Sequence, residues 1–303
     1  MIIGHKVSYK LIAASVVVLV FIIGLFSTSV DVDYQWNPLA TGDGGASSND
    51  TDDGAIAGGI PLRIMFLGAS ITRGEQSTGD RGYRLYMREK LTALGNPVNC
   101  VGFNRFGDFE DNDLEGYGAH RVREIHAHAQ QAVPPLQPNL IIIQVGTSDC
   151  FRNDEPLTLL SRMRAMVDYL LEASPRATVL MSTLVTTPNL QFEPCVLSVN
   201  AQIRQVANDL IRENKTVSLA EMHYNQGLPN RPTPNDFVPD QIHPTDEGYL
   251  MMGDIFMQSI REVEKKGFLQ SPVDIGIPDD GNKGREEEER IREKTQEEHP
   301  LNL

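Results

Sequence analysis

The chain has 303 residues, with 27 basic and 41 acidic side chains, a net charge of −14 and a hydrophobic content of 40%. This composition is typical of a globular protein with a sizeable core. The acidic charge argues against a nucleic-acid-binding protein, because binding to phosphate backbones relies on clustered lysine and arginine. Three cysteines without C-x-x-C spacing are too few for a disulfide scaffold and do not match a cysteine zinc site.

Residues 1–29 are predicted to form a segment directed to a membrane. No charged residue lies between positions 11 and 29, and Lys6 and Lys10 precede this apolar stretch. A membrane-spanning helix needs roughly 17–25 residues and the core of a signal peptide about 7–15. The length therefore fits a retained signal-anchor or a cleaved signal peptide. Both alternatives place the remaining chain in the secretory pathway, as a single-pass type II membrane protein or a secreted one.

Two further features agree with an oxidising, extracytosolic compartment. The sequons at Asn49 and Asn214 are candidate N-glycosylation sites. In such a compartment two of the three cysteines can pair. We favour Cys150 with Cys195, and three buried thiols are the alternative.

The composition divides the rest of the chain into three parts. Residues 30–60 are rich in Gly, Ser, Asp and Thr, which predicts a flexible acidic stalk. Residues 61–267 contain the apolar segments that can build a domain. Residues 268–303 carry many charges and few large apolar residues, which predicts a disordered, charged tail.

Strands and helices are predicted to alternate along 61–267. The predicted elements are, in chain order, a strand at 62–67, a helix at 82–94, strands at 98–101 and 140–145, a helix at 156–173, a strand at 177–184, a helix at 197–213, a strand at 216–219 and a helix at 246–263. Continuous apolar strands separated by helices indicate an α/β domain whose parallel sheet is covered on both faces. In such sheets the functional site lies at the carboxyl ends of the strands.

A serine follows the first predicted strand. Residues 68–72 read GASIT, so Ser70 lies among small neighbours where the strand ends. A serine hydroxyl is a weak nucleophile unless a base removes its proton. Ser70 is therefore a candidate nucleophile, and a turn-capping serine is the alternative.

An aspartate and a histidine stand three residues apart before the last predicted helix. Residues 240–243 read DQIH. In a tight loop, the Asp240 carboxylate can bond one ring nitrogen of His243 and leave the other nitrogen as a base. A surface histidine beside a turn-forming aspartate is the alternative.

Two loops of small residues lie between these blocks. Residues 115–120 read EGYGAH, and residues 146–149, GTSD, follow the most apolar predicted strand. Backbone N–H groups in such loops can stabilise the oxyanion formed during acyl transfer. Ordinary turn formation is the alternative for both.

The order and spacing of these four blocks resemble those of the SGNH, or GDSL-type, hydrolases. The resemblance covers nearly all of 61–267 and is closest to the acetyl-xylan esterases of carbohydrate esterase family 3. Further stretches that support it are GYR at 82–84, VNCVG at 98–102, DLEGY at 113–117 and HPTDEGY at 243–249. It implies a flavodoxin-like, three-layer α/β/α sandwich.

The resemblance also implies roles for individual residues. Ser70 is the expected nucleophile, and its own N–H is expected in the oxyanion hole. His243 is the expected general base, oriented by Asp240. The other expected oxyanion donors are Ser148 and Ala119, with Gly118 as the neighbouring choice for the latter.

The chain departs from the family pattern at two of these positions. Ala119 replaces a glycine and has less access to positive φ. Ser148 replaces the usual asparagine, so a short hydroxyl stands in place of a side-chain amide. Loss of one oxyanion donor costs about 10²–10³ in rate, which predicts a slow enzyme, a rearranged hole or a degenerate relative.

Several other residues near the predicted strand ends are candidates for substrate contact. They are Arg73, Tyr83, Tyr117, His120 and Arg121. His126 and His128 are predicted to be solvated, because no carboxylate or cysteine stands at metal-ligand spacing from them. We therefore expect no metal, and no cofactor because the nucleotide-binding glycine motifs are missing from the sequence.

Two functional hypotheses follow. The first is a serine esterase that hydrolyses short-chain, acetyl esters through an acyl-enzyme, with an acetylated polysaccharide as the expected partner. The second is a catalytically weakened SGNH-fold protein that binds glycans or a cell-wall polymer. The serine, aspartate and histidine favour the first hypothesis, and Ser148 favours the second.

Overall fold

The computed structural model describes residues 54–153, 156–298 and 300. The expected membrane-directed segment, most of the expected stalk and the sequon at Asn49 lie outside these residues. Among the described helices, none is long and apolar enough to cross a bilayer.

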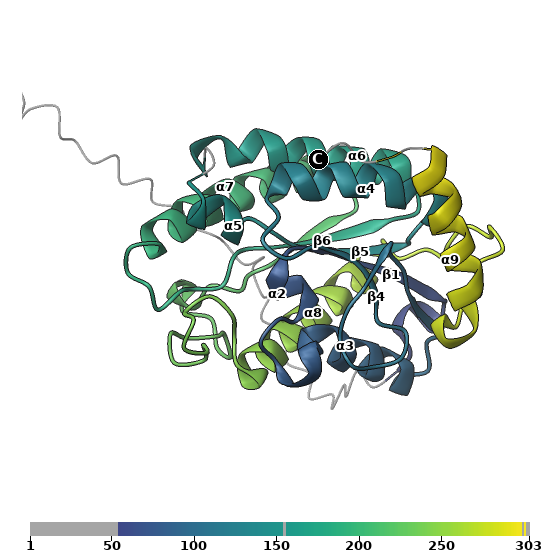
Figure 1. Cartoon of the computed structure of the whole chain (residues 1–303), viewed down its shortest axis with the longest axis horizontal. Helices are drawn as coiled ribbons and strands as arrows, with labels where there is room; N and C mark the ends of the chain where they lie inside the picture. Colours follow the sequence, from purple (N-terminus) through teal and green to yellow (C-terminus); the bar gives the residue numbers. More distant parts are fainter. Residues whose placement is uncertain (1–53, 154–155, 299, 301–303) are drawn as a thin grey trace, which may run out of the picture. The chain divides into compact units, whose positions relative to one another are not determined.

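A seven-stranded sheet forms the centre of the structure (Figure 1). Its strands are β1 (Leu62–Gly68), β2 (Val98–Cys100), β3 (Asn104–Arg105), β4 (Asp113–Gly116), β5 (Leu140–Gln144), β6 (Thr178–Ser182) and β7 (Val217–Ala220). The order is β3-β4-β1-β5-β6-β7, and β2 pairs with the first half of β1 while β4 pairs with its end. All pairs are parallel except β3 with β4.

Helices cover both faces of this sheet (Figure 1). The α-helices are α2 (Ser70–Arg73), α3 (Gly82–Ala93), α4 (Val122–Leu136), α5 (Thr147–Phe151), α6 (Leu159–Ala173), α7 (Glu193–Arg212), α8 (Asp246–Lys265) and α9 (Gly281–Glu298). The short 3-10 helices are η1 (Ile56–Gly58), η2 (Thr78–Asp80), η3 (Pro156–Thr158) and η4 (Tyr224–Gln226). The predicted three-layer α/β/α architecture is confirmed.

Alternation along the strands builds two apolar layers. On β5, Ile141 and Ile143 pack with α4, α6 and α7, whereas Leu140 and Ile142 pack with α3 and α8. Successive side chains of a strand point to opposite faces, so an uninterrupted apolar strand serves both layers.

Helix α4 was not predicted. Its apolar side chains recur at three- and four-residue spacing from Val122 to Leu136 and are buried, which is a helical pattern. The pair Pro134 and Pro135 in its last turn obscures that pattern in the sequence, because proline normally interrupts a helix.

The prediction of a disordered tail over 268–303 is wrong for the described part. Helix α9 packs against α4 and β2. Glu288 is only 3% exposed, and its Oε1 accepts a hydrogen bond from Asn99 Nδ2 at 2.8 Å. Ile291 packs on the apolar layer beside α4. A few specific contacts on one helix face therefore hold a segment whose average composition is highly charged.

The expected stalk also ends earlier than predicted. Ile56 is fully buried, and the side-chain oxygen of Asn96 accepts a hydrogen bond from its N–H at 2.8 Å. The nitrogen of the same amide donates to the carbonyl of Ile56 at 2.9 Å. Residues 54–60 therefore belong to the domain.

Candidate active site

Ser70 lies at the point where β1 gives way to α2. Gly68 ends the strand, and a Cβ atom at this position would lie 2.1 Å from the carbonyl oxygen of Gln144 on β5. Only glycine allows this close approach of the two strand ends. Ser70 is the first residue of α2, is half-buried, and is followed by Gly74 with a φ of 80° that ends the helix. The serine thus stands on a sharp turn at the carboxyl edge of the sheet.

Asp240 and His243 lie together in the loop before α8. Asp240 Oδ2 is 2.6 Å from Nδ1 of His243, and Oδ1 accepts the backbone N–H groups of Ile242 at 2.8 Å and His243 at 3.0 Å. The N–H of Val238 donates to the carbonyl of His243 at 3.0 Å and closes the loop. The spacing of three residues therefore brings carboxylate and imidazole together as the sequence predicted.

These contacts define how the imidazole can act. A carboxylate only accepts hydrogen bonds, so Nδ1 of His243 carries the proton and Nε2 of the neutral ring is the basic atom. Nε2 is sheltered and has no hydrogen-bond partner in the described part of the chain. Burial opposes ionisation of Asp240, but the hydrogen bonds from the His243 ring and from two backbone N–H groups lower the pKa of Asp240 below its usual value. The carboxylate is therefore charged and oriented at neutral pH.

The serine segment and the histidine loop are joined through residues that follow α2. The N–H of Glu75 donates to the carbonyl of Ser70 at 3.1 Å. The hydroxyl of Tyr249, on α8, donates to the carbonyl of Glu75 at 2.8 Å. Thr78 is bound through its N–H and its hydroxyl to the Asp246 carboxylate, at 2.8 and 2.6 Å. Three separate bonds therefore hold the turn at Ser70 against the start of α8.

The glycine-rich loop lies after β4, beside the end of β1. Ala119 is exposed and has a φ of 60°, in the left-handed region. His120 Nδ1 is 3.0 Å from the carbonyl oxygen of Gly118. A Cβ atom at Gly118 would lie 2.6 Å from Glu75 Oε1 and 2.8 Å from Arg73 Nη1. A side chain at position 118 would displace these two side-chain ends, so the backbone of Gly118 lies directly against two charged groups of the serine segment.

Tyr117, His128 and Glu115 form a cluster that packs beside this loop. The Tyr117 ring stacks on His128 with 3.6 Å between ring centroids, and His128 is 5% exposed. Burial lowers the pKa of His128 to about 4, so this ring is neutral. Burial raises the pKa of Glu115 to about 7, although the N–H of Phe103 donates to its carboxylate at 2.8 Å. The expectation that His128 is solvated is wrong, because it lies on the buried side of α4, stacked on Tyr117.

Ser148 lies in the short helix α5, which follows β5. It is 9% exposed. The next residue, Asp149, is fully buried, and its Oδ2 accepts the N–H of Val122 at the start of α4 at 3.1 Å. Its Oδ1 is 3.5 Å from Nη2 of Arg162. Asp149 therefore ties the loop that carries Ser148 to the helix that follows the glycine-rich loop.

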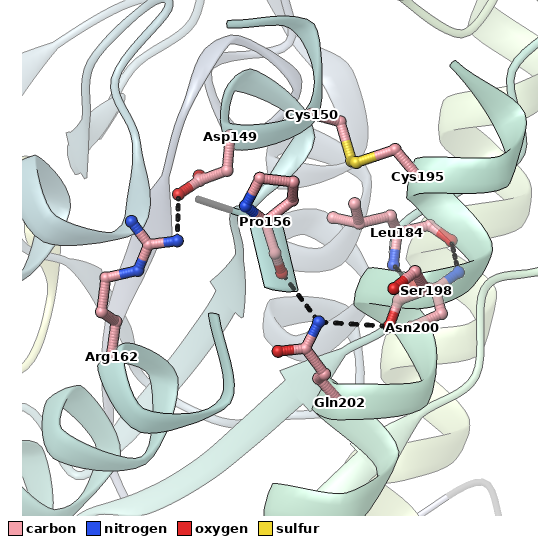
Figure 2. The surroundings of a disulfide bond; sticks show 9 residues. All are labelled: Asp149, Cys150, Pro156, Arg162, Leu184, Cys195, Ser198, Asn200 and Gln202. Carbon is pink, nitrogen blue, oxygen red and sulfur yellow. Dashed lines mark hydrogen bonds and ion pairs between the residues drawn. A yellow bond between two sulfur atoms is a disulfide. The ribbon is translucent and has the colours of Figure 1, made fainter. Parts of the chain in front are cut away.

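A disulfide joins Cys150 to Cys195 (Figure 2). It connects α5 to the first turn of α7, across 45 residues of sequence. The favoured pairing is thus confirmed, and Cys100 is left as a buried free thiol. Close to the bond, both the N–H and the carbonyl of Leu184 are bound by the Asn200 side chain, at 2.7 and 3.0 Å (Figure 2).

The residues predicted to contact substrate have different surroundings in the structure. Tyr83 is wrongly predicted, because it is fully buried against Phe256 and its hydroxyl bonds Thr72 at 3.2 Å. Arg121 forms the N-terminal capping box of α4 with Glu124. Tyr117 is half-buried in the cluster beneath the loop. Arg73 remains beside the site, with its guanidinium 3.5 Å from the centroid of the Phe106 ring.

No group of three or more His, Cys, Asp or Glu in the described chain is arranged to hold a metal ion. Asn214, the sequon within the described residues, is exposed at the end of α7.

The chain belongs to the GDSL-like lipase/acylhydrolase family, whose model matches residues 66–251. This match contains every block on which the resemblance to the SGNH hydrolases rests, and that resemblance is confirmed. No curated protein matches the chain.

Solved structures with the same fold include carbohydrate esterases. The family 3 carbohydrate esterase of Clostridium thermocellum has a TM-score of 0.59 and 19% identity, covering 68% of this chain and 98% of its own. A family 3 carbohydrate esterase from Talaromyces cellulolyticus has a TM-score of 0.57 and 19% identity, covering 68% and 99%. At this identity the likeness establishes the fold, which is that of the SGNH-type esterases.

Two residues of the site were not singled out from the sequence. Glu75 lies five positions after Ser70, and nothing in the spacing indicates that its side chain turns back toward His243. Asp149 stands next to Ser148 in a block that was singled out, but its buried bond to Val122 depends on the unpredicted helix α4. Both were missed because their partners are distant in sequence.

Proposed function

We propose that this protein is a serine esterase that hydrolyses short-chain carboxylic esters, with acetyl as the acyl group. The observation that supports this most is the Asp240–His243 pair, with 2.6 Å between Oδ2 and Nδ1. Nε2 of His243 has no hydrogen-bond partner among the described residues and is 4.0 Å from Oε2 of Glu75, five residues after Ser70. This is the arrangement that a serine nucleophile needs from its base.

In the proposed acylation, Nε2 of His243 takes the proton of the Ser70 hydroxyl as Oγ bonds the ester carbonyl carbon. The resulting oxyanion is stabilised by backbone N–H groups of Ser70 and of the loop at Gly118 and Ala119, and by Ser148. The bond to the alcohol oxygen then breaks, and the proton on Nε2 passes to that oxygen. The alcohol leaves and Ser70 holds the acyl group.

In the proposed deacylation, a water molecule gives one proton to Nε2 and bonds the acyl carbon. The bond to Ser70 Oγ breaks, and Oγ recovers the proton. The products are the free carboxylic acid and the starting enzyme. Asp240 keeps its negative charge throughout and stabilises the imidazolium that forms twice in the cycle.

Short acyl groups on a polysaccharide are the proposed substrates. The solved structures of similar fold are named as carbohydrate esterases, which supports this choice by analogy of fold. We also propose that the protein works in the secretory pathway or beyond it. The disulfide between Cys150 and Cys195 supports this location, because such bonds persist in oxidising compartments.

Hydrolysis of p-nitrophenyl acetate by the full-length protein tests the activity. We expect hydrolysis in the wild type and its loss in Ser70→Ala and His243→Ala, together with labelling of Ser70 by a fluorophosphonate. No hydrolysis above these variants, in protein shown to be folded, would contradict the proposal.

A second candidate function is a glycan- or cell-wall-binding protein with a weakened site. Ser148 favours it, because the amide donor usual at this position is replaced by a short hydroxyl. Binding of acetylated and deacetylated polysaccharides by a protein without Ser70-dependent hydrolysis would favour this second function.

A further inference from the structure

Glu75 is fixed in the candidate site by its backbone. Its N–H donates to the carbonyl of Ser70, and its carbonyl accepts the hydroxyl of Tyr249, which is 1% exposed. The preceding Gly74, at a φ of 80°, makes the turn that places it there. The position of Glu75 is therefore set by the segment of the candidate nucleophile and by the core of α8.

The two carboxylate oxygens of Glu75 have different surroundings. Oε1 is 3.0 Å from Nη1 of Arg73, and it lies against the backbone of Gly118. Oε2 is 4.0 Å from Nε2 of His243, and no described residue hydrogen-bonds it. The Glu75 side chain is 26% exposed. Oε1 is therefore held by an ion pair. Oε2 is free to accept a hydrogen bond near His243, the proposed general base.

Arg73 keeps this carboxylate in place. Its guanidinium lies 3.5 Å from the centroid of the Phe106 ring, and its side chain is 23% exposed. A cation over an aromatic face is stabilised there. Arg73 is therefore a positioning residue for Glu75. The Arg73 guanidinium is paired with Oε1, so the atom of this ion pair that lies near His243 is the acceptor Oε2.

Oε2 of Glu75 is a neighbour of the nitrogen that serves the alcohol part of an ester in the proposed mechanism. In the proposed mechanism, the alcohol oxygen takes its proton from Nε2 of His243, so it lies within hydrogen-bond distance of that nitrogen, about 2.7–3.2 Å. Oε2 lies 4.0 Å from the same nitrogen. A hydroxyl on a carbon next to the ester can therefore reach this carboxylate, which only accepts hydrogen bonds.

We propose that Glu75 is a specificity-determining residue that accepts a hydrogen bond from a free hydroxyl neighbouring the ester on its alcohol part. The substrate class is then an ester of an uncharged polyol, such as a sugar unit with a free vicinal hydroxyl. Esters with a carboxylate at that place are disfavoured by repulsion. This inference rests on the proposed esterase function.

A matched pair of substrates tests it with the full-length protein. One is a methyl pentopyranoside with a single acetyl group and a free neighbouring hydroxyl, and the other lacks only that hydroxyl. A hydrogen bond to a charged group predicts a kcat/KM ratio of about 10–100 in the wild type. We expect the ratio to fall several-fold in Glu75→Gln and to below about 2 in Glu75→Ala.

The ratio cancels general losses of activity, because both substrates meet the same protein. Glu247→Gln, at an exposed acidic position on α8, is the matched control and should keep the wild-type ratio. Thermal melting shows whether Glu75→Ala folds. If it does not, the kcat/KM ratio of the isosteric Glu75→Gln variant tests the proposal.

Two failures are distinguishable. A wild-type ratio near 1, or an equal ratio in wild type and both Glu75 variants, alongside Ser70-dependent hydrolysis, would overturn the role of Glu75 alone. Absence of Ser70-dependent hydrolysis of every ester tried would overturn the esterase function and this inference with it.

Discussion

Cys150, two residues after Ser148, is disulfide-bonded to Cys195 in the first turn of α7. The bond therefore fixes a five-residue helix, too short to be stable alone, to one of the long helices that cover the sheet. Asp149, between Ser148 and Cys150, binds the start of α4 on the other side. The candidate oxyanion donor at Ser148 thus depends on two anchors that do not belong to its own helix.

Removing the disulfide should reduce both stability and activity. A cross-link that closes 45 residues of chain is worth about 4 kcal/mol in the chain-entropy model. Thermal and denaturant unfolding of Cys150→Ser, Cys195→Ser and the double variant measure this loss. The two single variants should each lose as much as the double variant, since either one breaks the same bond. Additive losses would show that the two cysteines act separately.

Asp240→Asn should lower kcat by about 10⁴-fold while the fold is kept. The amide that replaces the carboxylate can donate to Nδ1 of His243, which favours the tautomer with the proton on Nε2 and removes the base. Kinetics with p-nitrophenyl acetate measure the loss, and thermal melting is the control for folding. A loss of less than tenfold would mean that Asp240 does not orient the base.

Ser148→Asn should raise kcat by up to about 10²-fold, because it restores a side-chain amide donor to the proposed oxyanion hole. Ser148→Ala is the matched variant, since it removes the hydroxyl without adding an amide. If that hydroxyl contributes, Ser148→Ala is slower than the wild type. An unchanged or slower Ser148→Asn would show that the hole is built from other donors.

The sequence predicted five of the seven strands of the described sheet, and the helices α3, α6, α7 and α8, because their patterns are local. The short strands β3 and β4 were not predicted. The run at 140–143 is apolar at every position and is buried on both faces, so it indicates a central strand by itself. Helix α4 has prolines in its last turn, and α9 is mostly charged. Helix α9 is held in place by contacts with residues that are distant in sequence, such as the bond between Glu288 and Asn99. The periodicity of its own sequence does not indicate these contacts.

The same distinction applies to the site. Asp240 and His243 are three residues apart, so hydrogen bonds within one short loop are enough to bring them together. Tyr83 and Glu75 both follow Ser70 closely in sequence, yet Tyr83 turns into the core and Glu75 turns toward His243. Which way each side chain points depends on α8 and on the glycine-rich loop, which are distant in sequence.

Glu288 predicts a pH dependence for the stability of the docked C-terminal helix. Burial raises the pKa of Glu288 from 4.5 to about 8, and the nearby Asp113 and Asp111 act in the same direction against the hydrogen bond from Asn99. Between about pH 4.5 and 8 the folded protein therefore holds a proton that the unfolded chain releases. Its contribution to the free energy of unfolding is full below this range, falls as the pH rises through it and is constant above it.

Replacing this carboxyl with a neutral amide removes that dependence. Glu288→Gln should lose less stability than the wild type between pH 5 and pH 8, and at pH 8 it should be the more stable protein. Denaturant unfolding at both pH values measures the difference, with Glu293→Gln, at an exposed position on the same helix, as the control. Equal pH dependence in the wild type and Glu288→Gln would mean that Glu288 is ionised in the folded protein and that α9 is held by other contacts.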